Sequence, residues 1–449
     1  MRFRVMIQTT LFKQFKTALE PKLHLGSGLT LALSGGVDSV VLLYLCKTYL
    51  ESLDSNQSIP VEAIYVNHGI SENAQDWQQF CEQLCLSLDI PFKTKRVNVQ
   101  PKARQSLEAL ARDARYQALD ELAEQGNLIL LGQHADDQLE TFLLRLKRGS
   151  GLTGLIAMHD TVRLSSGRQC IRPLLNIPRE DIEAFARTFS LAHIEDESNQ
   201  DDKFDRNFLR NQIIPLLKKR FNGFLKSTLR SIDLLQQQQA LIDEISQADL
   251  LFCEDKNDVP TTLKLNELKQ FSELRQSNVV RAWLSDLGVV MPSKAQMSQI
   301  LTQSLESRED AQMQVQLSKG AIRRYRDKLY FDTQDANPDN IDNIENIESA
   351  ILVLNDKATL KREPCGLLRL PFEHERVSIR FGLLKSQIKP YKKARSNTLK
   401  YWLKELKVPT WQRERIPLVF YNDNLVQVVG HFVSADYISE DSGISWELT

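Results

Sequence analysis

The sequence predicts an α/β protein that begins with a doubly wound parallel sheet, and three observations support this. Short apolar runs lie at residues 29–33 (LTLAL), 61–66 (VEAIYV) and 128–132 (LILLG). Longer stretches with helical periodicity separate them, which is typical of a parallel sheet with crossover helices. The length of 449 residues is too great for one ordinary core, so roughly two to four domains are expected.

The predicted α/β domain covers residues 1–215. Its best-defined helix spans residues 106–126 and ends on Gly126, a residue type that commonly closes helices. From residue 216 long helical stretches replace the alternation, with short strands only near 313–332. We therefore expect a second, mostly helical domain over residues 216–331.

The last part of the chain, from residue 332, contains two stretches of different composition. Residues 332–350 are acidic, rich in asparagine and poor in apolar side chains, so they are expected to form a solvated linker. Strand-like pieces then return at 377–381, 417–421 and 425–433. They predict a small α+β C-terminal domain over residues 351–449.

Composition points to a globular protein without a membrane segment. No apolar run approaches the roughly 18 to 20 residues that a membrane helix needs. The N-terminus lacks the continuous apolar region of a signal peptide, so a cytoplasmic location is expected. The formal net charge is −1, which argues against a surface that is basic throughout. The six cysteines are scattered without a paired Cys-x-x-Cys motif and are read as buried free thiols.

The loop Ser34-Gly35-Gly36-Val37-Asp38-Ser39, which follows the first apolar run, is the strongest candidate for a ligand site. Glycines let the backbone approach an anion closely, and the start of the next helix offers unpaired N–H groups and a favourable dipole. The two serine hydroxyls add donors. The loop therefore predicts a phosphate-bearing ligand, with a plain turn and helix N-cap as the alternative.

Asp38 is the unusual residue of that loop. The loop contains neither the Gly-Lys-Ser/Thr of a Walker A motif nor the dinucleotide pattern G-x-G-x-x-G. A carboxylate at position 38 would repel phosphate unless a metal lies between them. Asp38 thus suggests Mg²⁺ bound jointly with the phosphates.

The motif Ser-Gly-Gly-Val-Asp-Ser resembles the PP-loop of the N-type ATP pyrophosphatases, which cleave ATP between its α and β phosphates and adenylate a substrate. Three further stretches resemble one family of that group, the tRNA(Ile)-lysidine synthetases; they are EALARDARYQAL (108–119), GQHADDQLETFLLRLKRGSGLTGL (132–155) and DESNQDDKFDRNFLRNQIIPLL (196–217). Residues 281–296, 323–331 and 385–433 are similar, more loosely, to later domains of its longer, bacterial type. The resemblance implies an adenine nucleotide α-hydrolase-like fold for the first domain.

The resemblance also implies the reaction and its partners. ATP would adenylate the C2 carbonyl oxygen of the wobble cytidine in an isoleucine tRNA with a CAU anticodon, releasing pyrophosphate. The ε-amine of free L-lysine would then attack C2 and expel AMP. The product, lysidine, changes codon specificity from AUG to AUA. Because the attacking amine must be neutral, a nearby acidic group or a desolvated pocket has to take its proton.

Several residues are candidates for the catalytic site. Arg112 and Arg115, one helical turn apart, could cover developing phosphate charge, with an ion pair to Glu108 as the alternative. His134 would lie at the end of the strand 128–132, beside the nucleotide. His68 follows the second strand and is a further candidate for ATP binding, with a neutral turn histidine as the alternative.

An acidic helix face should follow His134. Asp137, Glu140 and Thr141 fall at i, i+3 and i+4 and would share that face, where they could bind a metal or orient an amine. We expect Asp137 or Glu140 to bind the amines of lysine or to act as base. The alternative is an N-cap and a solvated acidic face, and the sequence does not separate the two carboxylate roles.

Two groups of residues are candidates for tRNA binding. The first is a polar cluster near the end of the α/β domain, Arg206, Asn207 and Arg210. The second lies in residues 385–411, where cations surround aromatic side chains that could stack on bases; its candidates are Lys392, Lys393, Arg395 and Trp411. Domain-boundary capping, a solvated helix and core packing of the tryptophans are the alternatives.

Two other functions compete with lysidine synthesis. A PP-loop tRNA thiolase would share the loop and the RNA partner, but it needs reactive cysteines, and the sequence has no suitable Cys-x-x-Cys. In a non-catalytic nucleotide-binding protein of the same fold, the acidic face and the paired arginines would have no function. The oligomeric state stays open, with a dimer as one option.

Overall fold

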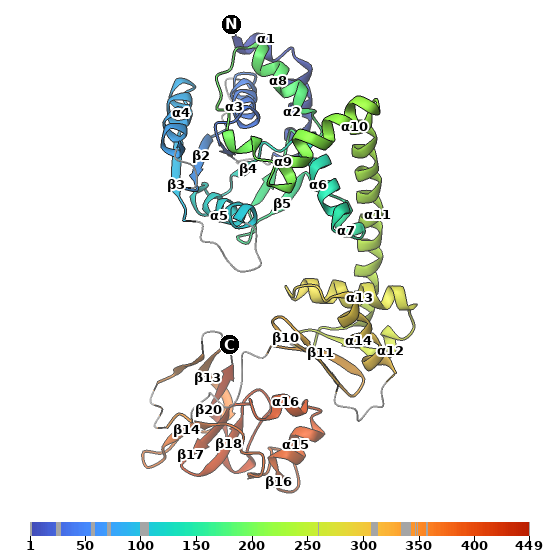
Figure 1. The fold of residues 1–449 in the computed structure, drawn as a ribbon. Coiled ribbons are helices and arrows are strands. Elements are labelled where there is room, and N and C mark those ends of the chain that lie inside the picture. The colour runs from blue at the N-terminus through green and yellow to red at the C-terminus, as the bar shows by residue number, and fades with distance from the viewer. Residues whose placement is uncertain are drawn as a thin grey trace. The chain divides into compact units, whose positions relative to one another are not determined.

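The structure is a computed structural model (Figure 1). It describes residues 2–23, 28–54, 59–69, 73–98, 107–258, 260–306, 313–333, 343–345, 347, 349–355 and 358–448. The chain divides into two compact units, Met1–Ile242 and Asp243–Thr449. No helix within the described ranges combines the length and the hydropathy that crossing a membrane requires.

The first unit is built on a six-stranded sheet, as far as the described residues go, with the order β3-β2-β1-β4-β6-β5. Its strands are β1 (Leu29–Ala32), β2 (Val61–Asn67), β3 (Phe92–Arg96), β4 (Leu128–Leu130), β5 (Thr161–Arg163) and β6 (Gln169–Ile171). All neighbours pair in parallel except β5 and β6. The predicted parallel sheet is confirmed, and the three apolar runs form its central strands β2, β1 and β4.

Helices cover both faces of this sheet, because side chains alternate along each central strand. Leu29, Leu31 and Leu130 pack on one face with helices that include α2 (Thr10–Leu19), α3 (Val37–Leu50), α4 (Ala74–Ser87) and α8 (Arg179–Thr188). Ile64 and Ile129 pack on the opposite face with α5 (Leu107–Leu122). Helix α5 confirms a helix within the predicted range 106–126, but it ends at Leu122 and not on Gly126, which lies in a turn.

The strand order places a ligand site at one point of the sheet. From β1 the chain first builds β2 and β3 on one side and later β4 and β6 on the other, so the order reverses at β1 and β4. In sheets of this type a crevice opens beyond the carboxyl ends of the strands at such a point. The loop 34–39 follows β1, and residues 132–134 follow β4.

The remaining helical elements of the first unit surround that edge or precede the sheet. They are α1 (Arg2–Met6), η1 (Glu20–Lys22), α6 (Ala135–Lys147), α7 (Leu152–Leu155), η2 (Glu197–Gln200), α9 (Asp205–Phe208), the π-helical turn η3 (Leu209–Ile213) and α10 (Ile214–Arg220). The long helix α11 (Phe224–Cys253) runs across the boundary into the second unit.

The second unit begins with helices packed on an antiparallel sheet. The helices are α12 (Leu265–Leu268), α13 (Glu273–Asp286) and α14 (Lys294–Leu305), around the fully buried Trp283. The strands are β7 (Glu254–Asp255), β8 (Thr262–Lys264), β9 (Gln314–Leu317), β10 (Gly320–Tyr325) and β11 (Lys328–Asp332), in the order β7-β8-β11-β10-β9. Strands were expected only near 313–332, so this region contains more sheet than predicted.

Within the described residues, the C-terminal part of this unit combines small sheets with two short helices. The strands are β12 (Ile351–Asn355), β13 (Ala358–Leu368), β14 (Val377–Arg380), β15 (Gln387–Ile388), β16 (Asn397–Thr398), β17 (Leu418–Tyr421), β18 (Asn424–Val428), β19 (Phe432–Val433) and β20 (Ile438–Leu448). The helices are α15 (Leu399–Glu405) and α16 (Thr410–Arg413), and a 3₁₀ turn, η5, spans Ala435–Tyr437.

Part of the segment predicted as a solvated linker is not solvated. Ile344 pairs with Ile379 of β14, and the amide of Ile347 donates to the carbonyl of Val377 over 3.0 Å. Ile347 also packs against the C-terminal core. Isoleucines at every third position carry these contacts, while most of residues 332–350 lie outside the described residues.

Candidate active site

The loop 34–39 has the geometry of an anion site at a helix start. Gly35 has φ +85°, and a Cβ there would lie 2.4 Å from Cδ1 of Ile194, so only glycine fits without strain. Gly36 is the N-cap residue of α3 and has open space at its Cα. Ser39 Oγ accepts from the Ser34 amide over 3.2 Å and donates to the Gly36 carbonyl over 2.9 Å, which holds the loop closed on itself.

The end of β4 lies directly against this loop. A Cβ at Gly132 would be 3.4 Å from the backbone of Asp38 and Ser39, so the two segments touch through their main chains. Two residues later, His134 begins α6 as its N-cap. Its Nδ1 accepts from the Asp137 amide at 3.4 Å, while an Asp137 oxygen accepts from the His134 amide at 3.0 Å.

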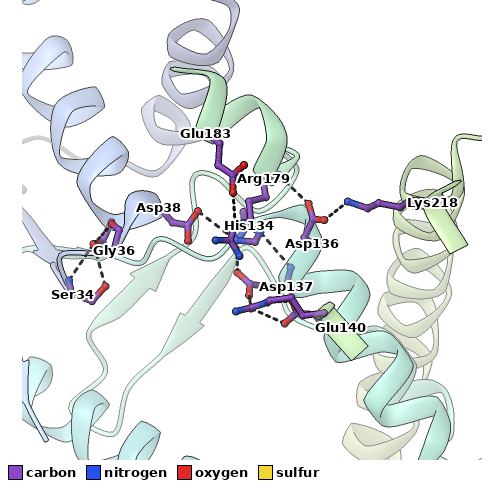
Figure 2. Close-up of polar contacts among 12 residues, drawn as sticks. Ser34, Gly36, Asp38, His134, Asp136, Asp137, Glu140, Arg179, Glu183 and Lys218 are labelled. Atoms are coloured by element: carbon purple, nitrogen blue, oxygen red, sulfur yellow. Dashed lines mark hydrogen bonds and ion pairs between the residues drawn. The ribbon is translucent and has the colours of Figure 1, made fainter. Parts of the chain in front are cut away.

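His134 joins the loop to the acidic helix. Its ring is 2% exposed, and Nε2 lies 3.5 Å from Oδ1 of Asp38 and 3.4 Å from Oδ2 of Asp137 (Figure 2). Because Nδ1 accepts from an amide, the proton of the neutral ring is on Nε2, between the two carboxylates. Burial alone would lower the pKa of His134, but Asp38, Asp137 and Asp136 outweigh it and raise the pKa above 6.5.

Asp38 is a carboxylate that stays ionised at the mouth of the site. Burial raises its pKa, yet His134 and the more distant Arg179 and Arg210 together lower the pKa below 3.8. Oδ1 makes no hydrogen bond to the described residues, and the side chain is 28% exposed. A partly buried, ionised carboxylate beside an anion loop suits Mg²⁺, which is usually bound through one or two carboxylates together with phosphates and water.

The first turns of α6 form the predicted acidic face, and it is buried. Asp136 accepts from the Arg179 amide at 2.9 Å and pairs with Lys218 of α10 (Figure 2). Burial raises the pKa of Asp136, but the opposite effects of Lys218 and the Arg179 amide are together larger. The pKa of Asp136 therefore lies below 3.8. These partners could not be predicted, since Lys218 and Arg179 come from segments distant in the chain.

Glu140 is held in a two-pronged ion pair. Its side chain is 1% exposed, and its two oxygens accept from Nε of Arg210 at 2.6 Å and from an outer nitrogen of Arg210 at 2.9 Å. The same outer nitrogen lies 3.3 Å from Asp137. The carboxylates raise the pKa of Arg210 against the effect of its burial, so the guanidinium is charged. Thr141, next on this face, is buried and its hydroxyl makes no hydrogen bond to the described residues.

The two predicted arginines of α5 differ in their surroundings. Arg112 is 59% exposed, whereas the Nε of Arg115 is buried. Burial, with the nearby Arg112 and Arg206, lowers the pKa of Arg115 although Asp137 acts against this. His68, at the end of β2, has its pKa lowered by burial and by Arg115. The alternative partner of Arg112, Glu108, has a side chain outside the described residues.

The candidate tRNA-binding residues of the first unit lie near the acidic face. Arg206 is 3.9 Å from Glu140, and the amide group of Asn207 donates to the Asp201 carbonyl over 3.0 Å. Arg210 is engaged by the carboxylates of α6, as described above. Helix α9 and the π turn η3 carry these three residues. The side of the helix on which each lies could not be predicted from α-helical periodicity, because a π turn shifts the faces of the helix.

In the second unit the lysines and the tryptophans behave differently. Lys392, Lys393 and Arg395 are exposed. Trp411 packs edge-on against Tyr325 and Tyr330, with ring centroids 6.1 and 5.7 Å away. Trp402, another aromatic residue of the segment 385–411, is buried in the core and donates to the Ile388 carbonyl.

Three family models match successive parts of the chain. A PP-loop domain model matches residues 7–217, a TilS substrate binding domain model matches 263–330, and a TilS substrate C-terminal domain model matches 377–448. The ranges follow the sheet of the first unit, the middle sheet with its helices, and the C-terminal sheets.

Curated relatives match nearly end to end. A tRNA(Ile)-lysidine synthase of Vibrio parahaemolyticus is 37% identical over 97% of this chain and 99% of its own length. The synthase of Vibrio vulnificus is 39% identical over the same shares. Among solved structures, a U34-tRNA thiolase from Methanococcus maripaludis is 20% identical, covers 50% of this chain and 78% of its own, and has a TM-score of 0.43, too low to support an argument.

The cysteines do not suit sulfur transfer. The five described thiols, Cys46, Cys81, Cys85, Cys170 and Cys253, are buried and free. Burial raises the pKa of the Cys81 and Cys85 thiols to about 12, so they stay protonated and unreactive near neutral pH. The thiolase alternative is therefore not favoured.

Proposed function

Because the chain belongs to the tRNA(Ile)-lysidine synthase family, we propose that its first unit carries out both steps of lysidine formation at the edge of β1 and β4. The protein is an ATP-dependent ligase that forms lysidine in tRNA(Ile). The single observation that carries the assignment of the site is the convergence of Asp38, His134 and Asp137 beside the start of α3 (Figure 2).

In the first step the loop 34–39 would bind the phosphates of ATP. Its glycines and the N–H groups at the start of α3 support this role, whereas the hydroxyls of Ser34 and Ser39 donate within the loop and hold its shape. Asp38 would hold Mg²⁺, which would neutralise charge on the pyrophosphate leaving group. Arg112 and Arg115 would stabilise charge that develops on the α phosphate. His68, kept neutral by burial and by Arg115, would lie beside the nucleotide.

His134 would organise the site for adenylation. Its Nε2 proton lies between Asp38 and Asp137. A change in the charge of one carboxylate would therefore alter the interaction of His134 with the other. The wobble cytidine oxygen would attack the α phosphorus, and pyrophosphate would leave. The C2–O bond, now activated as an AMP ester, is the bond that the second step breaks.

In the second step lysine would bind to the acidic face of α6. Asp137 is linked to Asp38 through His134, so we assign it the proton of the ε-ammonium group. Glu140 and Thr141, further along the same face, would bind the rest of lysine. The neutral amine would attack C2, and AMP would leave with the former carbonyl oxygen.

The substrate RNA would be held mainly by cations outside this pocket. Lys392, Lys393 and Arg395 are exposed, which supports contact with phosphates, and Arg206 and Asn207 border the acidic face. Trp411 is packed between tyrosines, so any effect on RNA binding would act through that packing.

One assay tests the proposed reaction. The protein is incubated with ATP, Mg²⁺, labelled L-lysine and a transcript of isoleucine tRNA with a CAU anticodon. We expect label in the RNA, with AMP and pyrophosphate formed in equal amounts. Omitting lysine should leave pyrophosphate release that depends on the tRNA. Binding of the tRNA without any incorporation of lysine would refute the proposal.

A further inference from the structure

Arg210 occupies the place where a cationic substrate would have to bind. Both oxygens of Glu140 are used by the Arg210 guanidinium, at 2.6 and 2.9 Å, and the carboxylate is 1% exposed. An outer nitrogen of the same guanidinium also reaches Asp137 at 3.3 Å. An ammonium group can pair with Glu140 only if this guanidinium moves away.

The segment that carries Arg210 is fastened to α6 at three points. Asp205 pairs with Lys147, Arg210 pairs with Glu140, and Lys218 pairs with Asp136. The two segments run antiparallel, so the first contact of this segment is made with the end of α6 and the last with its start. The outermost pair is exposed, since both side chains are more than 60% accessible, whereas the acidic side chains of the other two pairs are buried.

The backbone beneath Arg210 is the unusual part of this segment. Leu209–Ile213 forms a π turn between the α-helical elements α9 and α10. A π turn holds one residue more per hydrogen-bonded ring than an α-helix, and such turns are frequent at functional sites. Returning it to α geometry would rotate the preceding residues by roughly 100° about the helix axis, which would carry Arg210 off the acidic face.

We propose that Arg210 is the resident counter-cation of Asp137 and Glu140, and that L-lysine binds by displacing its guanidinium from them. This inference rests on the proposed function, because it concerns the same acidic face. Exchange of one cation for another leaves the buried carboxylates paired in both states, which avoids the cost of an uncompensated buried charge. The affinity for lysine is then a difference between two ion pairs, and Arg210 lowers it.

The test compares the KM for L-lysine in Arg210→Gln and in the wild type, at saturating ATP and tRNA. Glutamine removes the competing charge, so the KM should fall about tenfold or more, a change of about 1.4 kcal/mol in binding. The matched control is Asp205→Asn, which breaks the exposed contact of the same segment and should change the KM less than about twofold. An unchanged or higher KM in Arg210→Gln would overturn the inference.

A second pair of variants guards against a folding defect, since Arg210→Gln leaves Glu140 buried without its partner. The double variant Glu140→Gln, Arg210→Gln replaces the pair by two neutral amides. If Arg210 acts through Glu140, adding Arg210→Gln to Glu140→Gln should change the KM for lysine less than about threefold. A full tenfold effect in that background would show that Arg210 acts elsewhere.

Two further measurements distinguish a failure of this inference from a failure of the proposed reaction. Release of pyrophosphate without lysine reports adenylation, so its absence in the wild type would refute the proposed function whatever Arg210 does. Added guanidinium ion should compete with lysine in Arg210→Gln, where it can fill the vacated place beside Glu140, and should compete much less in the wild type. Equal competition in both proteins would count against displacement.

Discussion

At the scale of single residues, Asp38 concentrates the chemistry of the first step. It is the one carboxylate of the loop 34–39, its pKa is lowered by His134 against the effect of burial, and its Oδ1 makes no hydrogen bond to the described residues. An ionised carboxylate with one oxygen that has no hydrogen-bond partner among the described residues suits a metal ligand better than a structural role.

We expect Asp38→Asn to reduce kcat by at least about 100-fold, because the amide cannot replace a carboxylate as a ligand of Mg²⁺. The affinity for tRNA should change less than about twofold, since we assign RNA binding to other residues, which are cationic. Steady-state kinetics and filter binding measure the two quantities. Asp54→Asn, at an exposed aspartate in the segment after α3, is the matched control. Turnover that is retained in Asp38→Asn would remove the metal role.

Lys218 should stabilise the start of α6 in a way that depends on pH. The pKa of Asp136 is lowered in the folded protein, so its ion pair contributes stability above the carboxyl's ordinary pKa near 3.8, and this stability is lost as the pH falls through the lower folded value. In Lys218→Met, amides of α6 should lose about 1–2 kcal/mol of protection at pH 7, and this deficit should shrink as the pH falls below about 3.8.

Hydrogen exchange of α6 between pH 7 and pH 3 measures this loss of protection. Lys219→Met, next in the chain and exposed, is the matched control and should leave protection unchanged. A deficit of the same size at both ends of the pH range would contradict the role of Asp136.

The sequence located the residues that lie in contiguous motifs but not their partners. Asp38, His134, Asp137 and Glu140 were all expected at strand ends or on one helix face, and the structure brings them together. Lys218 and Ile194 could not be predicted, because their contacts with α6 and with Gly35 join segments that only the tertiary fold brings together. Long-range pairing leaves no periodic signal in a single sequence.

At the scale of elements, the turn between β1 and α3 depends on two glycines for different reasons. Gly35 needs its positive φ and has no room for a Cβ, while Gly36 has φ −67° and a Cβ would meet nothing closer than Ser34 Oγ at 3.7 Å. The first glycine therefore shapes the loop, and the second keeps clear the space in which an anion would bind.

Alanine at each position should separate these two roles. Gly35→Ala should destabilise the protein by about 2 kcal/mol or more, from the strained φ and the contact with Ile194. Gly36→Ala should cost under about 1 kcal/mol, yet raise the KM for ATP about tenfold or more, because its methyl group would occupy the anion space. Thermal unfolding and ATP kinetics measure both effects. If Gly36→Ala bound ATP normally, the loop would not hold the phosphates as proposed.

Elements were predicted best where burial makes a long apolar signal. The central strands β1, β2 and β4 and helix α5 were all expected from their patterns. Strand β3 (FKTKR) was missed, because an edge strand with alternating lysines resembles a loop. The strands β7 and β8 were missed because they are only two and three residues long.

At the scale of the whole molecule, the basic segment near the C-terminus is tied to the sheet that precedes it. Arg413 donates to the hydroxyl of Tyr325 at 3.0 Å, and Arg415 pairs with Asp332 at 2.6 Å, beside the ring contacts of Trp411. These arginines and this tryptophan hold the two parts of the second unit together. We assign RNA binding to the exposed Lys392, Lys393 and Arg395, although the net charge of the chain is only −1.

The triple variant Lys392→Gln, Lys393→Gln, Arg395→Gln should therefore weaken tRNA binding and make it less sensitive to salt. Each phosphate contact contributes roughly 0.7–0.9 to the slope of log K against log salt, so the loss of three contacts should reduce that slope by about 2 to 3. Pyrophosphate release at saturating tRNA should stay near the wild-type rate, because these residues belong to the second unit and not to the first.

The control must remove the same charge from sites that are already neutralised. Lys16, Lys256 and Lys361 each pair with a nearby carboxylate, and their replacement by glutamine changes the net charge equally. If the salt dependence reflects local phosphate contacts, only the first triple variant should lower the slope. Equal slopes for the two variants would mean that tRNA senses the total charge of the protein, and the three exposed cations would then lose their assignment as a binding site.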